Sequence, residues 1–278
     1  LEYFVAAYSQ WLDQGAYALR IDTVPFMPGE YWKAFGDRMR AKRPGLFMFA
    51  EAFNYDAEKI AVHTYPENGG ISVLDFPGKQ AMNEVFAGDK PFSALVPPLH
   101  LESQLYENPY ELMTFYDNHD MDRMNADVDG FIDANNWLFT SRGIPVVYYG
   151  SEIGFRAGTN EHTGNRDYFG QDNVNSARSH PIRKALQRIA EVRKGSVALQ
   201  RGLQVNGRFG DDTAEFFRVY EKDGVAQTAL VLLNKSDEPV EFVVDKFVSA
   251  GVWRDTLAGD VIEVSASRPV LTATVGAH

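Results

Sequence analysis

Short apolar runs that end in polar residues recur along the first part of the sequence. The first reads Tyr-Ala-Leu-Arg-Ile-Asp at residues 17–22, and the second reads Leu-Phe-Met-Phe-Ala-Glu at residues 46–51. Runs this short and this apolar are typical of strands buried in a parallel sheet. Comparable runs follow at 71–74, 111–116 and 144–149. The pattern therefore predicts five buried strands.

Segments with helical spacing separate these runs. We expect helices at residues 2–14, 30–41, 56–61, 78–87, 100–106, 130–141 and 181–194, and a long Gly- and Asn-rich loop at 150–180. Strands that alternate with helices build a parallel α/β sheet. A closed barrel of this type needs eight strands, and five runs are visible in this chain.

The pattern changes at about residue 199. Runs rich in Val, Phe, Leu and Thr follow at 213–220, 227–234 and 239–245, separated by turn sequences such as Asp-Gly. This alternation predicts an antiparallel β-sandwich. We therefore divide the chain into residues 1–198, an α/β part with a parallel sheet, and residues 199–278, a β-sandwich domain.

Composition excludes several classes of protein. The net charge is −11 and there is no long basic run, which argues against nucleic acid as a partner. The sequence has no cysteine, so disulfides and thiolate metal sites are excluded. No apolar stretch is long enough to span a membrane. No targeting segment is visible, and the compartment stays open, with a secreted or periplasmic location preferred.

Two of the predicted strands end in a carboxylate, Asp22 and Glu51. The carboxyl ends of neighbouring parallel strands lie at one end of a barrel, where such folds keep their chemistry. A pair of acids there suits glycoside hydrolysis. Arg20 precedes Asp22 by two residues and shares its side of the strand, so we expect it to hold Asp22 ionised. A single strand-end acid is more often a helix cap or an ion-pair partner, so a third element has to decide.

That third element is Phe-Tyr-Asp-Asn-His-Asp at residues 115–120. Together with Ala-Leu-Arg-Ile-Asp-Thr-Val at 18–24 and Phe-Ala-Glu at 49–51, it resembles three signature regions of the α-amylase family of glycoside hydrolases. Arg-Gly-Ile-Pro-Val-Val-Tyr-Tyr-Gly-Ser-Glu at 142–152 is similar to the last barrel strand of that family. The order and spacing agree as well.

The resemblance implies that the chain supplies about strands four to eight of a TIM barrel and the β-sandwich that follows it. Strands one to three, and the family's first signature region, would then lie in an N-terminal segment of the same enzyme. We expect that segment to be a partner that completes the barrel.

The resemblance also implies roles for individual residues. Asp22 would be the nucleophile and Glu51 the general acid/base, with apolar neighbours that suit a proton donor. Asp120 would hydrogen-bond sugar hydroxyls and favour the transition state, and His119 would bind the same sugar. The implied substrate is an α-glucan, and the chemistry requires no cofactor.

Further residues carry weaker signals. Phe53 matches an acceptor-side aromatic of the cyclodextrin-forming members, the alternative being a core Phe. Arg166 resembles a donor-side sugar contact in those members, the alternative being a loop salt bridge. At 23–26 the chain reads Thr-Val-Pro-Phe where the family often has Ala-Val-Lys-His. The usual acceptor contacts are thus absent. A structural calcium stays possible, with most of its ligands outside this chain.

Three functions are compatible with these residues. The first is a retaining hydrolase of α-1,4-glucans such as starch and maltodextrins. The second is a transglycosylase such as a cyclodextrin glucanotransferase, which shares the three acids and differs in its acceptor contacts. The third is a non-catalytic sugar-binding relative, which the presence of all three acids disfavours. A metal-dependent barrel hydrolase is disfavoured because no His pair with ligand spacing ends a strand.

Overall fold

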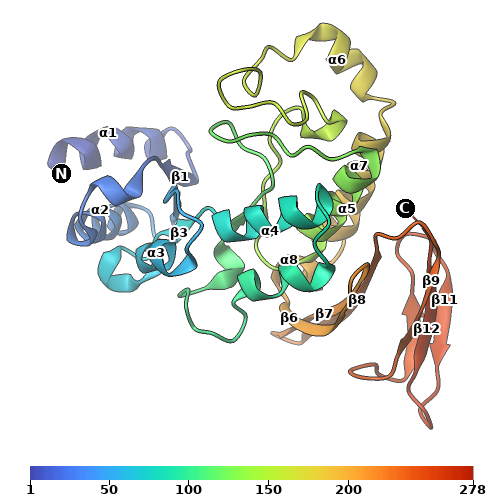
Figure 1. The fold of residues 1–278 in the computed structure, drawn as a ribbon. Helices are drawn as coiled ribbons and strands as arrows, with labels where there is room; N and C mark the ends of the chain where they lie inside the picture. The colour runs from blue at the N-terminus through green and yellow to red at the C-terminus, as the bar shows by residue number, and fades with distance from the viewer. Residues whose placement is uncertain (278) are drawn as a thin grey trace. The chain divides into compact units, whose positions relative to one another are not determined.

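A computed structural model describes residues 1–277 of the chain (Figure 1). The chain forms two compact units, which we describe separately. The first comprises Leu1–Ala81, Pro97–Phe115 and Gly143–Val146; the second comprises Met82–Val96, Tyr116–Arg142 and 147–277.

A parallel sheet forms the centre of the first unit. β1 (Ala18–Ile21), β2 (Phe47–Ala50) and β3 (Ser72–Val73) pair side by side in chain order. A bridge between Leu74 and Met113 continues the sheet to β4 (Met113–Thr114), which pairs with β5 (Ile144–Pro145). The five predicted strands are confirmed.

Helices with one apolar side pack against this sheet. α1 (Glu2–Asp13), α2 (Gly29–Lys42) and α3 (Ala57–Ala61) lie between or before the strands. In α2, Phe35 and Met39 recur one turn apart, so both are buried, beside Met48 and Ala50 of β2. α4 (Phe76–Phe86) begins directly after β3. The sequence pattern located all four helices.

The expectation that the first run is buried was wrong for most of β1. Only Ile21 is buried in this strand, and Tyr17 before it is 81% exposed. β1 pairs with β2 alone among the described strands. A strand with one partner lies at the edge of its sheet, which explains why its apolar side chains stay accessible.

The predicted helix at 100–106 is also absent. The structure has 3₁₀ turns at Phe92–Leu95 and Pro97–Leu99 instead. His100 and Gln104 adopt positive φ angles of 49° and 53°, which a right-handed helix does not contain. The adjacent prolines at 97 and 98 remove two backbone donors, so apolar spacing alone is not enough to form a helix here.

The helical part of the second unit contains α5 (Val128–Thr140), α6 (Gly170–Ala177), α7 (Pro181–Lys194) and α8 (Val197–Arg201). The 150–180 segment is therefore not a loop throughout, because it holds α6 and a 3₁₀ turn at Ser151–Ile153. α6 is short and mostly exposed, and its only larger apolar residue is Val174, so the sequence gave little to reveal it. No helix of the described chain is both long and apolar enough to cross a membrane.

The rest of the second unit is antiparallel. β6 (Leu203–Phe209), β7 (Thr213–Lys222) and β8 (Val225–Asn234) form one sheet, in the order β6-β7-β8. β9 (Val240–Val244) pairs with β12 (Leu271–Val275), and β10 (Gly251–Arg254) pairs with β11 (Val261–Val264). Side chains of β7, β9, β11 and β12 share one core, which includes Phe217, Phe242, Val264 and Leu271.

β6 was not among the predicted strands, although Leu203, Val205 and Phe209 alternate with the polar Gln204, Asn206 and Arg208. The alternation does not match burial, because Leu203 is exposed and Gln204 is buried. The pairing of β6 with β7 also shifts register between Asn206 and Phe209. The buried Arg218 of β7 donates hydrogen bonds to the carbonyl oxygens of Thr140 and Gly202 at 2.7 and 2.9 Å. The guanidinium thereby ties the sheet to the end of α5.

Candidate active site

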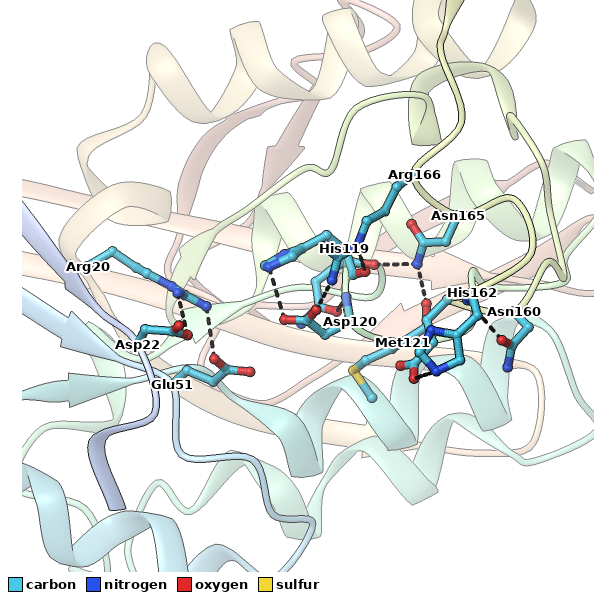
Figure 2. A network of polar contacts seen from close by, with 12 residues as sticks. Arg20, Asp22, Glu51, His119, Asp120, Met121, Asn160, His162, Asn165 and Arg166 are labelled. Atoms are coloured by element: carbon cyan, nitrogen blue, oxygen red, sulfur yellow. Dashed lines mark hydrogen bonds and ion pairs between the residues drawn. The ribbon is translucent and has the colours of Figure 1, made fainter. Parts of the chain in front are cut away.

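Arg20 links the two carboxylates of the first unit. Its Nη1 donates to Asp22 Oδ1 at 2.7 Å and its Nη2 donates to Glu51 Oε2 at 3.0 Å (Figure 2). The contact with Asp22 confirms the predicted pairing. The contact with Glu51 was not predicted, because the sequence placed only apolar neighbours around that acid. One guanidinium therefore orients both acids.

Backbone hydrogen bonds hold the same two acids side by side. The amide of Glu51 donates to Ile21 O at 2.9 Å, and the amide of Val24 donates to Glu51 O at 3.0 Å. The pairing of β1 with β2 thus continues beyond the strand ends, where parallel sheets place functional residues. Between these bonds, Thr23 has φ 48° and ψ 46°, a left-handed conformation that is rare for a β-branched residue.

The two carboxylates differ in exposure. The side chain of Asp22 is 67% exposed, whereas that of Glu51 is 10% exposed. An accessible carboxylate can approach a substrate carbon, and a sheltered one is protected from exchange with bulk water. Such a difference in exposure suits glycoside hydrolysis, which needs two carboxyl groups with different roles.

Phe53 follows Glu51 by two residues and is 60% exposed. Its ring contacts the buried Phe76 edge-on, with 5.1 Å between ring centroids. The alternative of a core Phe is therefore wrong. A supported, accessible ring of this kind can stack on an apolar sugar face.

His119, Asp120 and Arg166 come together within the second unit. His119 Nε2 lies 2.9 Å from Asp120 Oδ2, and the Arg166 guanidinium pairs with Asp120 Oδ1. Arg166 Nε also donates to His119 O at 2.8 Å (Figure 2). The side chains of all three are between 38% and 60% exposed. The loop salt bridge that was the alternative for Arg166 is present, and its partner is a candidate site residue.

Two residues that support this segment were not predicted from the sequence. Asp117 is buried and accepts hydrogen bonds from Met124 N at 2.6 Å and from Ser151 Oγ at 2.8 Å. Arg123 is also buried, with its guanidinium 4.5 Å from the ring centroid of Tyr148. Asp117 stands within the motif at 115–120, which was its only signal. Arg123 lies outside every motif and gave none.

Tyr148 lies beside His119, with 6.5 Å between ring centroids. Burial, and then the neighbouring Tyr149, raise the pKa of Tyr148 to about 12. The phenol therefore stays protonated at neutral pH and remains available as a hydrogen-bond donor.

A cavity of about 240 Å³ lies elsewhere in the first unit. Its lining includes Ser72, the first residue of β3, and Glu111, which precedes β4. It is therefore at the amino-terminal ends of the strands, whereas Asp22 and Glu51 follow the carboxyl-terminal ends. In barrels of this kind the amino-terminal end serves stability, so we do not place the candidate site there.

The described residues contain no group of three or more His, Cys, Asp or Glu side chains that could hold a metal ion. The structural calcium that the resemblance suggests would take most of its ligands from outside this chain. It therefore stays a prediction, and no step below depends on it.

Residues 2–223 match the family description "Alpha amylase, catalytic domain". The chain belongs to this family. It is 29% identical over 264 residues to a cyclomaltodextrin glucanotransferase of Thermoanaerobacterium thermosulfurigenes, covering 92% of this chain and 36% of the relative. It is 30% identical over 287 residues to an α-amylase of Niallia circulans, covering 99% of this chain and 52% of the relative.

Solved structures agree with this assignment. A cyclomaltodextrin glucanotransferase with a three-domain ABC distribution matches with a TM-score of 0.81 and 26% identity, covering 99% of this chain and 57% of that one. An α-amylase from Geobacillus thermoleovorans, complexed with acarbose, matches with a TM-score of 0.83 and 22% identity, covering 99% and 61%. The chain thus has the fold of part of an α-amylase-family enzyme and spans between about one third and three fifths of these relatives.

Proposed function

We propose that the protein is a retaining glycoside hydrolase that acts on α-1,4-glucans through a covalent glucosyl-enzyme. The observation that carries this proposal is the single guanidinium of Arg20 between Asp22 and Glu51. A retaining mechanism needs two carboxyl groups close together, about 5–5.5 Å apart, because one attacks the carbon whose leaving oxygen the other protonates. Shared contact with one guanidinium supports that proximity.

In the first step, Asp22 attacks the anomeric carbon while the glycosidic C–O bond breaks. Glu51 donates its proton to the departing oxygen, so the leaving sugar departs as a neutral alcohol. Arg20 stabilises the attacking carboxylate before the step and the Glu51 carboxylate after it. The product is an ester between Asp22 and the sugar.

In the second step, Glu51 takes a proton from water, and the water oxygen displaces Asp22 from the anomeric carbon. Two inversions at one carbon leave its configuration unchanged. We assign Asp120 and His119 to the hydroxyl groups of the reacting sugar. Their mutual contact, and the ion pair of Asp120 with Arg166, support an oriented polar pair suited to that task.

Transglycosylation is the second candidate function. Phe53 favours it, because this exposed and supported ring is placed two residues after the acid and can hold an acceptor sugar. Several of the matched relatives are cyclomaltodextrin glucanotransferases. Maltoheptaose distinguishes the two functions, since hydrolysis yields shorter maltooligosaccharides and transfer also yields longer or cyclic ones.

We further propose that residues 1–198 form the C-terminal part of a TIM barrel, about strands four to eight, and residues 199–278 a β-sandwich. An N-terminal segment of the same enzyme would complete the barrel. The partial coverage of the relatives supports this proposal. So do the two outer strands of the parallel sheet, β1 and β5, each of which has one partner in the described chain.

Two experiments test the mechanism in the protein that contains this chain. NMR of the sugar first released from a maltooligosaccharide should show the α-anomer, and the β-anomer would refute retention. Asp22→Asn and Glu51→Gln should each abolish turnover, whereas Asp37→Asn, in an exposed ion pair with Lys33, should not. Activity within tenfold of the parent in either site variant would refute the catalytic role proposed for that residue.

A further inference from the structure

The side chain of Asn165 lies inside the turn that carries His119 and Asp120. Asn165 has 0% exposure. Its amide nitrogen Nδ2 donates to Asn118 O at 2.8 Å and also to Met121 O (Figure 2). These two carbonyl groups flank the pair of candidate site residues. One amide group therefore spans the turn from its first residue to its last.

Other bonds hold the turn at single points. Asp120 N donates to the side chain of Asn118 at 2.9 Å, within the turn itself. The Asp117 carboxylate fixes the chain just before the turn and, through Met124 N, just after it. Among the bonds described between this turn and the 160s loop, those of Asn165 reach the backbone on both sides of His119 and Asp120.

Asn165 is itself firmly held. Its backbone carbonyl oxygen accepts from Nε and Nη2 of the buried Arg123, at 3.2 and 2.9 Å, and from the Tyr149 hydroxyl at 3.2 Å. The next residue, Arg166, bonds to His119 O and pairs with Asp120. Adjacent residues thus hold the turn. The Asn165 amide bonds to its backbone, and the Arg166 guanidinium bonds to both its backbone and the Asp120 carboxylate.

We propose that Asn165 is a positioning residue that sets the orientation of His119 and Asp120 toward the substrate. The inference rests on the proposed function and adds to it a residue that contacts no reacting atom. The hydrogen bonds and the limited space at this position require an asparagine side chain. Two N–H donors at this length serve two carbonyl oxygens, whereas aspartate would place a negative charge against both. Glutamine would need room for one more methylene in a fully buried place.

The test uses Asn165→Asp in the protein that contains this chain, with 4-nitrophenyl α-maltotrioside as substrate. We expect kcat to fall about 100-fold, because misplacement of a site group by about 1 Å has that effect, and KM to change much less. Asn175→Asp is the matched control. It makes the same chemical change on the exposed side of α6, where the residue accepts a bond from Gln171 that a carboxylate can also accept. It should keep the parental kcat.

A double-mutant cycle separates positioning from a general effect on stability. If Asn165 acts through Asp120, adding Asn165→Asp to Asp120→Asn should lower kcat less than threefold further. A full additional loss in the double variant, or parental kcat in Asn165→Asp, would overturn the proposal. If Asn165→Asp does not fold, the uncharged Asn165→Ala takes its place in the cycle. If both Asn165 variants misfold while Asn175→Asp folds, Asn165 maintains the structure of the loop and is not a positioning residue.

Failure of this inference is distinct from failure of the proposed function. If Asp22→Asn keeps its activity, the proposed mechanism fails whatever Asn165 does. If Asp22→Asn is inactive while Asn165→Asp has parental kcat, only the positioning role fails.

Discussion

The ion pair between Arg20 and Asp22 contributes little to the stability of the fold. The side chain of Arg20 is 34% exposed and that of Asp22 is 67% exposed, so water screens their attraction. Exposed pairs of this kind contribute about 0–1 kcal/mol to folding. The planar guanidinium instead offers two donors in fixed directions, one toward each carboxylate. Orientation of the acids is therefore what a substitution at Arg20 should disturb.

Arg20→Lys should lower kcat by at least about 100-fold, because a single ammonium cannot hold both acids in place. The free energy of unfolding should change by less than about 1 kcal/mol. Kinetics on maltoheptaose and urea unfolding measure the two effects. Arg38→Lys, in an exposed ion pair with Glu2, serves as the control and should leave kcat unchanged. Equal kcat in the Arg20→Lys variant and the parent would show that the shared guanidinium has no role in orienting the acids.

At the scale of elements, the turn after β1 contains backbone strain beside the candidate nucleophile. Thr23 is exposed and left-handed, and a β-branched side chain in that region costs about 1–3 kcal/mol. The bonds of Ile21 O and Val24 N to the Glu51 backbone hold the conformation in place. Strain at such a position is expected where the approach of a catalytic group matters more than stability.

Thr23→Asn should raise the free energy of unfolding by about 1 kcal/mol, since asparagine tolerates the left-handed region better than threonine. Chemical unfolding of the protein measures the change. Thr274→Asn, on the exposed side of β12, is the matched control, and it should destabilise slightly because asparagine is disfavoured in strands. A destabilised Thr23→Asn variant would mean that the turn is not strained by its side chain.

The 3₁₀ turn Val62–Thr64 carries a pH-sensitive group. Burial lowers the pKa of His63 below its usual value. The unfolded chain, with a pKa of about 6.5, therefore takes up a proton before the folded chain does. Stability should consequently fall as the pH drops below about 6.5 and level off beneath the folded pKa.

His63→Gln should remove this part of the pH dependence. Urea unfolding of parent and variant at a series of pH values from about 8 to about 5 isolates it as the difference between the two curves. We expect the parent to lose stability relative to the variant on acidification. If the stabilities of the parent and of His63→Gln change in parallel with pH, the His63 ring is solvated alike in the folded and unfolded states.

At the scale of the whole molecule, the parallel sheet of the first unit has two outer strands. β1 pairs with β2 alone and β5 pairs with β4 alone among the described strands. Exposed aromatic side chains, Tyr3, Trp11 and Tyr17, lie on α1 and directly before β1. Open edges with apolar surroundings favour association with other chains. In a closed barrel, further strands would cover both edges.

Residues 1–278 expressed alone should accordingly be unstable or aggregated and inactive. Co-expression with an N-terminal segment of the same enzyme that supplies the remaining strands should give a cooperatively melting, active protein. Size-exclusion chromatography, thermal melting and a maltoheptaose assay test this. An active, monomeric product from residues 1–278 alone would contradict the proposed barrel completion.

The sequence by itself determined the order of the strands and the identity of the candidate acids. Both are local properties, because period, run length and the residue at a strand end can be recognised within a few positions. Asp22 and Glu51 were placed at neighbouring strand ends without any contact being known. The helix at 181–194 was located with the same bounds, since its apolar stripe and its initial Pro181 are local as well.

Only the tertiary structure decided how these residues are held. Arg20 meets Glu51 across 31 positions, and Asn165 meets Asn118 across 47. No short-range period encodes such pairs, because their partners become neighbours through the packing of strands and loops. The absent helix at 100–106 shows the same limit, since prolines and positive φ angles overrode a local pattern. The local sequence identified the candidate acids, whereas long-range packing brought the residues that orient them into contact.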